Sequence, residues 1–95
     1  AEPLLAEAAE KARRMLEKGD FKRGAILLTY GDCLLNLGRP AEAVTTLLEA
    51  QESLAGLKPE HAAVQRLFKT LAAAYEGTGD ATAAAVWRAK VLAPG

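Results

Sequence analysis

Apolar residues recur at steps of three and four along most of this chain, a spacing that is typical of amphipathic helices. In the first segment these positions run from Leu4 to Leu16 and include Met15, while charged residues occupy the opposite face. Pro3 suits a first helical turn, where its missing N–H would have no partner. Gly19 predicts the end of this helix, and Asp20 predicts the N-cap of the next one.

Four further segments show the same spacing. They predict helices over about Phe21 to Leu37, Pro40 to Ala55 and Glu60 to Glu76, and a last helix that is capped by Asp80 and turns Ala84, Trp87, Val91 and Leu92 inward. In the third helix, Glu42, Glu49 and Glu52 are expected to face water. No segment alternates in the way of a strand, so we predict an all-α protein of five helices joined by tight turns.

Two glycines in the second helix predict a close contact with a neighbouring helix. Gly24 and Gly31 lie seven residues apart on one face, where each lowers helix propensity by about 1 kcal/mol relative to alanine. Close approach of another helix would compensate for that loss.

Composition and charge exclude several classes of function. The chain has 95 residues, enough for one small core, and its excess of alanine and leucine favours helix. Twelve basic and twelve acidic residues give no net charge, which argues against a nucleic-acid partner. No apolar run reaches the roughly 20 residues of a membrane span, and no signal peptide is evident. We therefore expect no membrane partner and a cytoplasmic location.

The sequence contains few residues that could form a catalytic site. His61 is the single histidine and Cys33 the single cysteine, and neither lies in a metal-binding or nucleophile motif. Cys33 lies in an apolar helical run, where a thiol packs as a small hydrophobic group. We expect no enzyme activity, no metal and no cofactor.

Two predicted helix–turn–helix elbows repeat at a fixed interval. The first spans Gly31 to Ala43 and the second Ala72 to Ala84, and their turn glycines, Gly38 and Gly79, are 41 residues apart. A regular interval of this kind indicates a helical repeat.

These residues resemble the tetratricopeptide repeat, a helix–turn–helix unit with small residues at its eighth, twentieth and twenty-seventh positions. In the first repeat Gly31, Ala43 and Ala50 take the small positions, Gly38 the turn, and Leu27, Leu34 and Leu47 the large positions. In the second repeat Phe68, Leu71, Ala72, Tyr75, Gly79 and Ala84 match. The 41-residue interval is similar to the longer repeats of kinesin light chains. The resemblance implies a short α–α superhelix of stacked antiparallel hairpins.

The sequence differs from the tetratricopeptide pattern at several positions. Arg88 stands where a large apolar residue is usual, with Trp87 one position early, and Val91 replaces the third small residue of the second repeat. Gly19 could serve as the turn of an alternative register, but Lys11 would then occupy a large apolar position. We therefore expect a single domain over 1–95, with 1–18 a capping or preceding-repeat helix, 21–55 the first repeat and 60–93 the second.

By this resemblance, a partner surface forms on the first helix of each repeat. Its candidate residues are Leu28, Asp32, Leu35, Asn36, Arg66, Lys69, Ala73 and Glu76. We expect a non-enzymatic interaction module that binds a peptide or partner helix, with Leu28 and Leu35 as apolar contacts or, alternatively, as core residues. Arg66 and Lys69 would select an acidic flank of the partner, or serve only as solvated charges.

A related family of tetratricopeptide domains clamps chaperone tails with Lys and Asn side chains. Leu28 and Asp32 stand at the corresponding positions of the first repeat, so we do not expect chaperone-tail binding. The remaining alternative is a structural role, in which the array forms a homo-oligomer or packs against other repeats of a larger protein.

Overall fold

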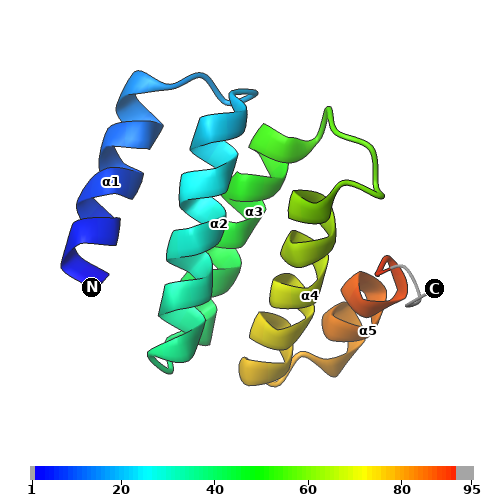
Figure 1. Cartoon of the computed structure of the whole chain (residues 1–95). Coiled ribbons are helices and arrows are strands. Elements are labelled where there is room, and N and C mark those ends of the chain that lie inside the picture. The colour runs from blue at the N-terminus through cyan, green and yellow to red at the C-terminus, as the bar shows by residue number, and fades with distance from the viewer. Residues whose placement is uncertain (1, 92–95) are drawn as a thin grey trace.

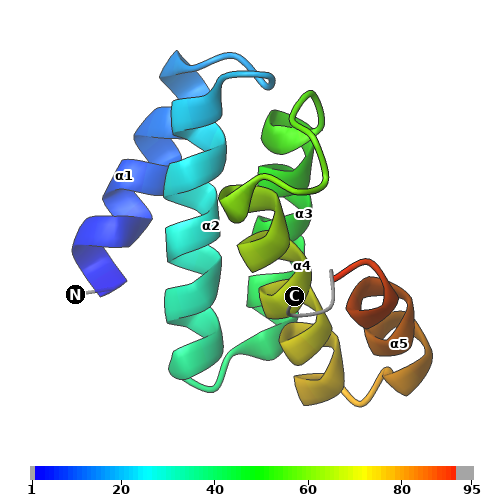
Figure 2. The same cartoon turned by 45° about the vertical axis from the view of Figure 1, so that its right-hand side comes forward.

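The protein folds as a row of antiparallel helices. The computed structural model describes residues 2–91, apart from the side chain of Glu2. Within that range the helices are α1 (Glu2–Met15), α2 (Phe21–Asn36), α3 (Pro40–Leu54), α4 (Ala62–Gly77) and α5 (Ala81–Ala89). Each helix contacts the next one in the chain, and α2 also contacts α4 (Figures 1 and 2). The all-α prediction is confirmed.

Three helix boundaries differ from the predicted ones by two residues or more, and the others by one residue at most. The first helix ends at Met15, short of Lys18. The fourth begins at Ala62, because His61 is its N-cap and its Nδ1 accepts a hydrogen bond of 3.1 Å from the backbone N–H of Ala63. The fifth ends at Ala89, before the two last residues that were predicted to point inward. Of these, Val91 is half-buried, and Leu92 lies outside the described residues.

The core lies where α2, α3 and α4 meet. Its largest fully buried side chains are Leu27, Leu34, Leu47, Leu54, Leu67 and Leu71. In contrast, Leu4 and Met15 on α1 are 69% and 76% exposed, although the apolar spacing placed both of them on the apolar side of that helix. The reason is that α1 packs against α2 through its alanine side, with Ala9 and Ala12 buried, and the side that bears Met15 faces outward.

The two glycines of α2 lie against α3 at very short range. A Cβ atom built on Gly31 would lie 2.6 Å from Cγ of Leu47, and one built on Gly24 would lie 2.8 Å from Cδ2 of Leu54. Atoms cannot remain that close, so the side chains of α3 fill space that any larger residue on α2 would need. The predicted close contact at Gly24 and Gly31 is confirmed.

The two hairpin turns have the same hydrogen bonds. In the first, the N–H of Gly38 donates to the carbonyl of Leu35 at 3.0 Å, and the N–H of Arg39 donates to that of Leu34 at 2.9 Å. In the second, Gly79 donates to Glu76 at 3.0 Å and Asp80 donates to Tyr75 at 3.0 Å. Both glycines have positive φ, +76° and +85°, as a glycine at this type of helix end requires.

The same interval also relates the two helix starts. Asp20 caps α2 by accepting from the N–H of Lys22 at 2.8 Å, and His61 caps α4 by accepting from that of Ala63 at 3.1 Å. Each of these residues lies 41 positions from its counterpart, as the turn glycines do. The helix α1 therefore precedes α2 in the chain as α3 precedes α4.

Candidate functional site

The candidate partner surface lies on α2 and α4, which the structure places in contact. Of its two apolar residues, Leu28 is only 2% exposed and belongs to the core, so it cannot contact a partner. Leu35 is half-buried and packs on the same core, and its Cδ1 lies 3.9 Å from the point where a Gly77 Cβ would be. The structure thus selects the core alternative for Leu28, and largely for Leu35.

The remaining candidate residues form a polar surface, which we call the α2–α4 face: Asp32, Asn36, Arg66, Lys69, Ala73 and Glu76. Nη2 of Arg66 donates to Oδ2 of Asp32 at 3.3 Å and so joins the two helices. All but Asp32 are exposed, and Asp32 is half-buried. The structure thus brings the predicted polar residues together, and the guanidinium of Arg66 is paired with the carboxylate of Asp32.

The end of the α2–α4 face is fixed by a second ion pair. Glu76 pairs with Arg88 of α5, with Nη2 and Oε1 2.5 Å apart. This contact accounts for Arg88 at a position where the repeat pattern would place a large apolar residue: the side chain is exposed and binds the preceding helix. Trp87, one residue earlier, packs on Phe68 instead, with ring centroids 5.9 Å apart.

The residues predicted for structural roles in the repeat behave as a group. Gly31, Ala43, Ala50, Ala72 and Ala84 are buried, and Tyr75 is half-buried against the core. Gly38 and Gly79 form the turns. Small residues therefore occupy buried positions in α2, α3, α4 and α5, and Gly31 among them lies directly against Leu47 of α3.

A pocket that the sequence did not indicate lies at the C-terminal end of α3, beside the connection to α4. It has a volume of about 410 Å³ and is lined by Gln51, Glu52, Leu54, Ala55, Leu57, Pro59, Val64, Leu67 and Phe68. Its walls are mainly apolar, and Glu52 is its single carboxylate. The sequence signal that could have indicated this region is the connection between α3 and α4, residues 55–61, which contains Pro59 and is longer than the connections between the other helices.

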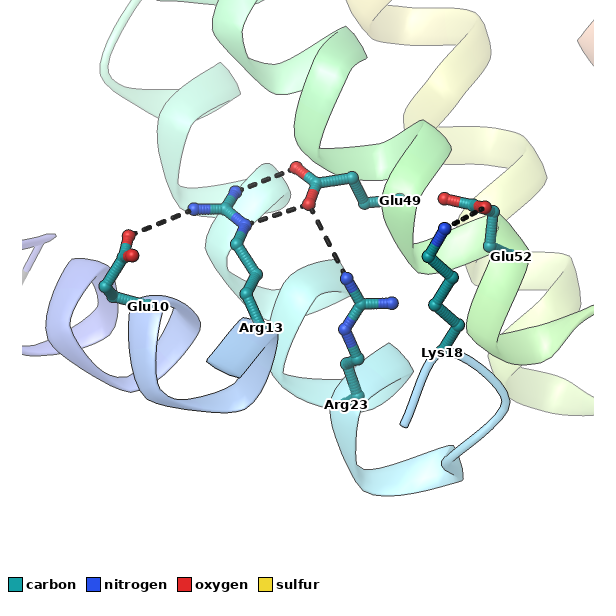
Figure 3. A network of polar contacts seen from close by, with 6 residues as sticks. All are labelled: Glu10, Arg13, Lys18, Arg23, Glu49 and Glu52. Carbon is teal, nitrogen blue, oxygen red and sulfur yellow. Dashed lines mark hydrogen bonds and ion pairs between the residues drawn. The ribbon is translucent and has the colours of Figure 1, made fainter. Parts of the chain in front are cut away.

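A cluster of charged residues joins α1 and α2 to α3 (Figure 3). Arg13 donates from Nε and Nη2 to the two carboxylate oxygens of Glu49, each at 2.9 Å. Arg23 reaches the same carboxylate, with Nη2 3.8 Å from Oε2. Glu49 was predicted to face water, and this prediction is wrong, because arginines from two other helices partly cover it.

Arg23 is the more unusual member of this cluster. It is only 6% exposed, and its Nε and Nη1 have no hydrogen-bond partner within the part of the chain that the structure describes. An arginine cannot lose its charge at ordinary pH, so the carboxylate of Glu49 is its main electrostatic compensation.

Neither a metal site, nor a membrane-spanning helix, nor a known family identifies a function for the described part of the chain. Between residues 2 and 91, no three His, Cys, Asp or Glu side chains are arranged to hold a metal ion. No described helix has the length and apolarity that crossing a membrane requires. No protein-family model matches the chain, and neither the curated proteins nor the solved structures include a significant match.

Proposed function

We propose that this chain is a non-enzymatic protein-interaction module of the tetratricopeptide type, which binds an extended peptide on the α2–α4 face. The main support is the 41-residue relation between the two hairpins, whose turns have matching hydrogen bonds. The first helices of the two hairpins, α2 and α4, contact each other, and Asp32 and Arg66 are paired between them. Side chains from two helices thereby lie on one surface.

The chemistry of the α2–α4 face favours recognition by polar contacts. Leu28 and Leu35 pack beneath it, so affinity would come from hydrogen bonds and charges together with the small side chain of Ala73. Asn36 offers both donor and acceptor groups to a peptide backbone. Lys69 is exposed and would favour an acidic residue of the peptide, since oppositely charged groups steer association and select partners.

A displayed random-peptide library, selected on the purified chain, tests this proposal. We expect enrichment of peptides with an acidic residue, and binding should perturb the backbone amide resonances of Asn36, Lys69 and Ala73. Lys69→Glu should weaken binding at least tenfold. The matched control is Lys58→Glu, the same change at an exposed position in the connection between α3 and α4. Failure to select any binder, or resonance changes confined to the pocket around Leu57, would refute the proposed site.

A further inference from the structure

The outer side of α1 has an apolar surface that the other described helices leave open. Leu4, Ala8, Lys11 and Met15 follow at steps of four, three and four residues, so they share one face of the helix. Leu4 and Met15 are the two most exposed large apolar side chains among the described residues. Beside this face is a groove of about 270 Å³, lined by Ala8, Lys11, Ala12, Met15, Leu16 and Ile26.

We infer that this outer α1 surface pairs with the same surface of a second copy of the chain, with the two α1 helices antiparallel. A two-fold symmetric contact uses the same surface of both copies, so this surface must be complementary to itself. Leu4 precedes Met15 by 11 residues, which is about 16 Å along a helix. With the axis near the middle of α1, Leu4 of each copy meets Met15 and the groove of the other.

The groove is suited to receive a leucine side chain. Ala8 and Ala12 form part of its wall, and their small side chains leave the space that Met15, Leu16 and Ile26 border. Its wall is nearly all apolar, apart from the lysine at its edge. The protruding Leu4 therefore lies toward one end of this face, and the apolar groove lies beside the face toward its other end.

Charges beside this face select the antiparallel arrangement. Glu7, Lys11 and Arg14 follow at steps of four and three on its flank, and all three are exposed. In the antiparallel dimer, Glu7 of one copy lies beside Lys11 and Arg14 of the other, and the same pairs recur across the axis. In a parallel two-fold alignment this flank would lie against the opposite flank of the partner helix, so these charge pairs would not form.

The corresponding face of α4 differs in chemistry from the outer side of α1. One interval of 41 residues after Leu28 and Leu35, the corresponding positions of α4 are Lys69 and Glu76. Both are exposed, and Glu76 is paired with Arg88. The two positions that hold buried or half-buried leucines on α2 therefore hold exposed charged residues on α4, whereas the outer side of α1 is apolar. This inference goes beyond the proposed peptide site, because it uses a different surface.

Sedimentation equilibrium of the chain across a wide concentration range tests the inference. A contact made by one helix and the edge of another is small for a specific interface, so we expect a reversible dimer that dissociates on dilution. The average mass should rise from the 10.0 kDa of one chain toward twice that value as concentration increases. Met15→Glu should weaken dimerisation at least tenfold, because it places a carboxylate in the contact.

The matched control is Val86→Glu on α5, which makes the same kind of change at another exposed apolar residue. It should leave the dissociation constant unchanged. A chain that stays monomeric at all concentrations would overturn the inference. So would a dimer that Val86→Glu weakens as much as Met15→Glu does.

A charge exchange tests the antiparallel register independently of apolar contact. Glu7→Lys makes the flank wholly basic, and the double variant Lys11→Glu, Arg14→Glu makes it wholly acidic. Each variant alone should dimerise at least tenfold more weakly than the original chain, and an equimolar mixture should form heterodimers. All substituted side chains are exposed, so the melting temperatures should stay close to that of the original chain. Normal homodimers of either variant would contradict this register.

Discussion

Removing the charge of Glu49 should destabilise the protein far more than the same change three residues later. Glu49→Gln keeps the size of the side chain but removes the carboxylate that Arg13 and Arg23 share. The control is Glu52→Gln on the same helix. The nearest cation to Glu52 is Lys18, 4.0 Å away, and both of these side chains are more than half exposed.

The magnitude follows from the burial of the partners. Loss of one partner from a fully buried ion pair costs about 3–5 kcal/mol. The side chain of Arg23 is 7% exposed, but those of Arg13 and Glu49 are 30% and 26% exposed, so water compensates part of the loss. We expect Glu49→Gln to lower the free energy of unfolding by about 2–4 kcal/mol. Glu52→Gln should change it by less than about 0.5 kcal/mol, as is usual for exposed pairs.

A double-mutant cycle separates the role of Arg23 from that of Arg13. Arg23→Met removes the buried cation together with its two unpaired nitrogens. In the Arg23→Met background, Glu49→Gln should cost at least 1 kcal/mol less than in the original chain, a coupling within the range of about 0.5–3 kcal/mol for contacting residues. Urea unfolding followed by far-ultraviolet circular dichroism supplies each free energy. Equal costs for Glu49→Gln and Glu52→Gln, or no coupling to Arg23, would refute the reasoning.

Three further substitutions test the core and the turns. Leu28→Ala should lower the free energy of unfolding by about 2–5 kcal/mol in urea titrations, because the side chain is buried; a change below 1 kcal/mol would restore it as a surface residue. Gly31→Ala should cost about 1–3 kcal/mol by forcing a Cβ against Leu47, whereas Gly56→Ala, which meets nothing within 4 Å, should cost little. Gly79→Ala should lower the thermal midpoint, since an L-residue at φ +85° costs about 1–2 kcal/mol, and an unchanged midpoint would contradict the turn geometry.

The parts of the fold that depend on local chemistry could be predicted from the sequence. Apolar spacing located the helices, and Gly38 and Gly79 located the turns, because a left-handed residue at a helix end strongly favours glycine. Gly24 and Gly31 predicted a close contact with another helix, because such a contact would offset the low helix propensity of glycine. Asp20 and Asp80 were identified as caps, since their carboxylates accept from the first free N–H groups.

The parts that depend on which helices become neighbours could not be predicted in this way. Periodicity shows that Leu28 and Met15 lie on apolar faces but not what covers each face. Leu28 is buried within the core cluster to which α2, α3 and α4 contribute, and Met15 is exposed because α1 turns its alanine side to the core. Glu49 was misassigned for the same reason, since its arginine partners come from helices 36 and 26 residues away in the sequence.

The row of helices, each in contact with its neighbour in the chain, has a consequence for how the protein reaches its folded state. Most helix pairs that touch are joined by short turns, so little chain entropy is lost before each contact forms. Proteins dominated by such local contacts fold in microseconds to milliseconds. Stability in such a row is close to a sum over neighbouring helices, so opening should begin at α5 and reach α2 and α3 last. The ion pair of Arg13 with Glu49 is an exception, because it links α1 to the second helix along and couples that end to the centre.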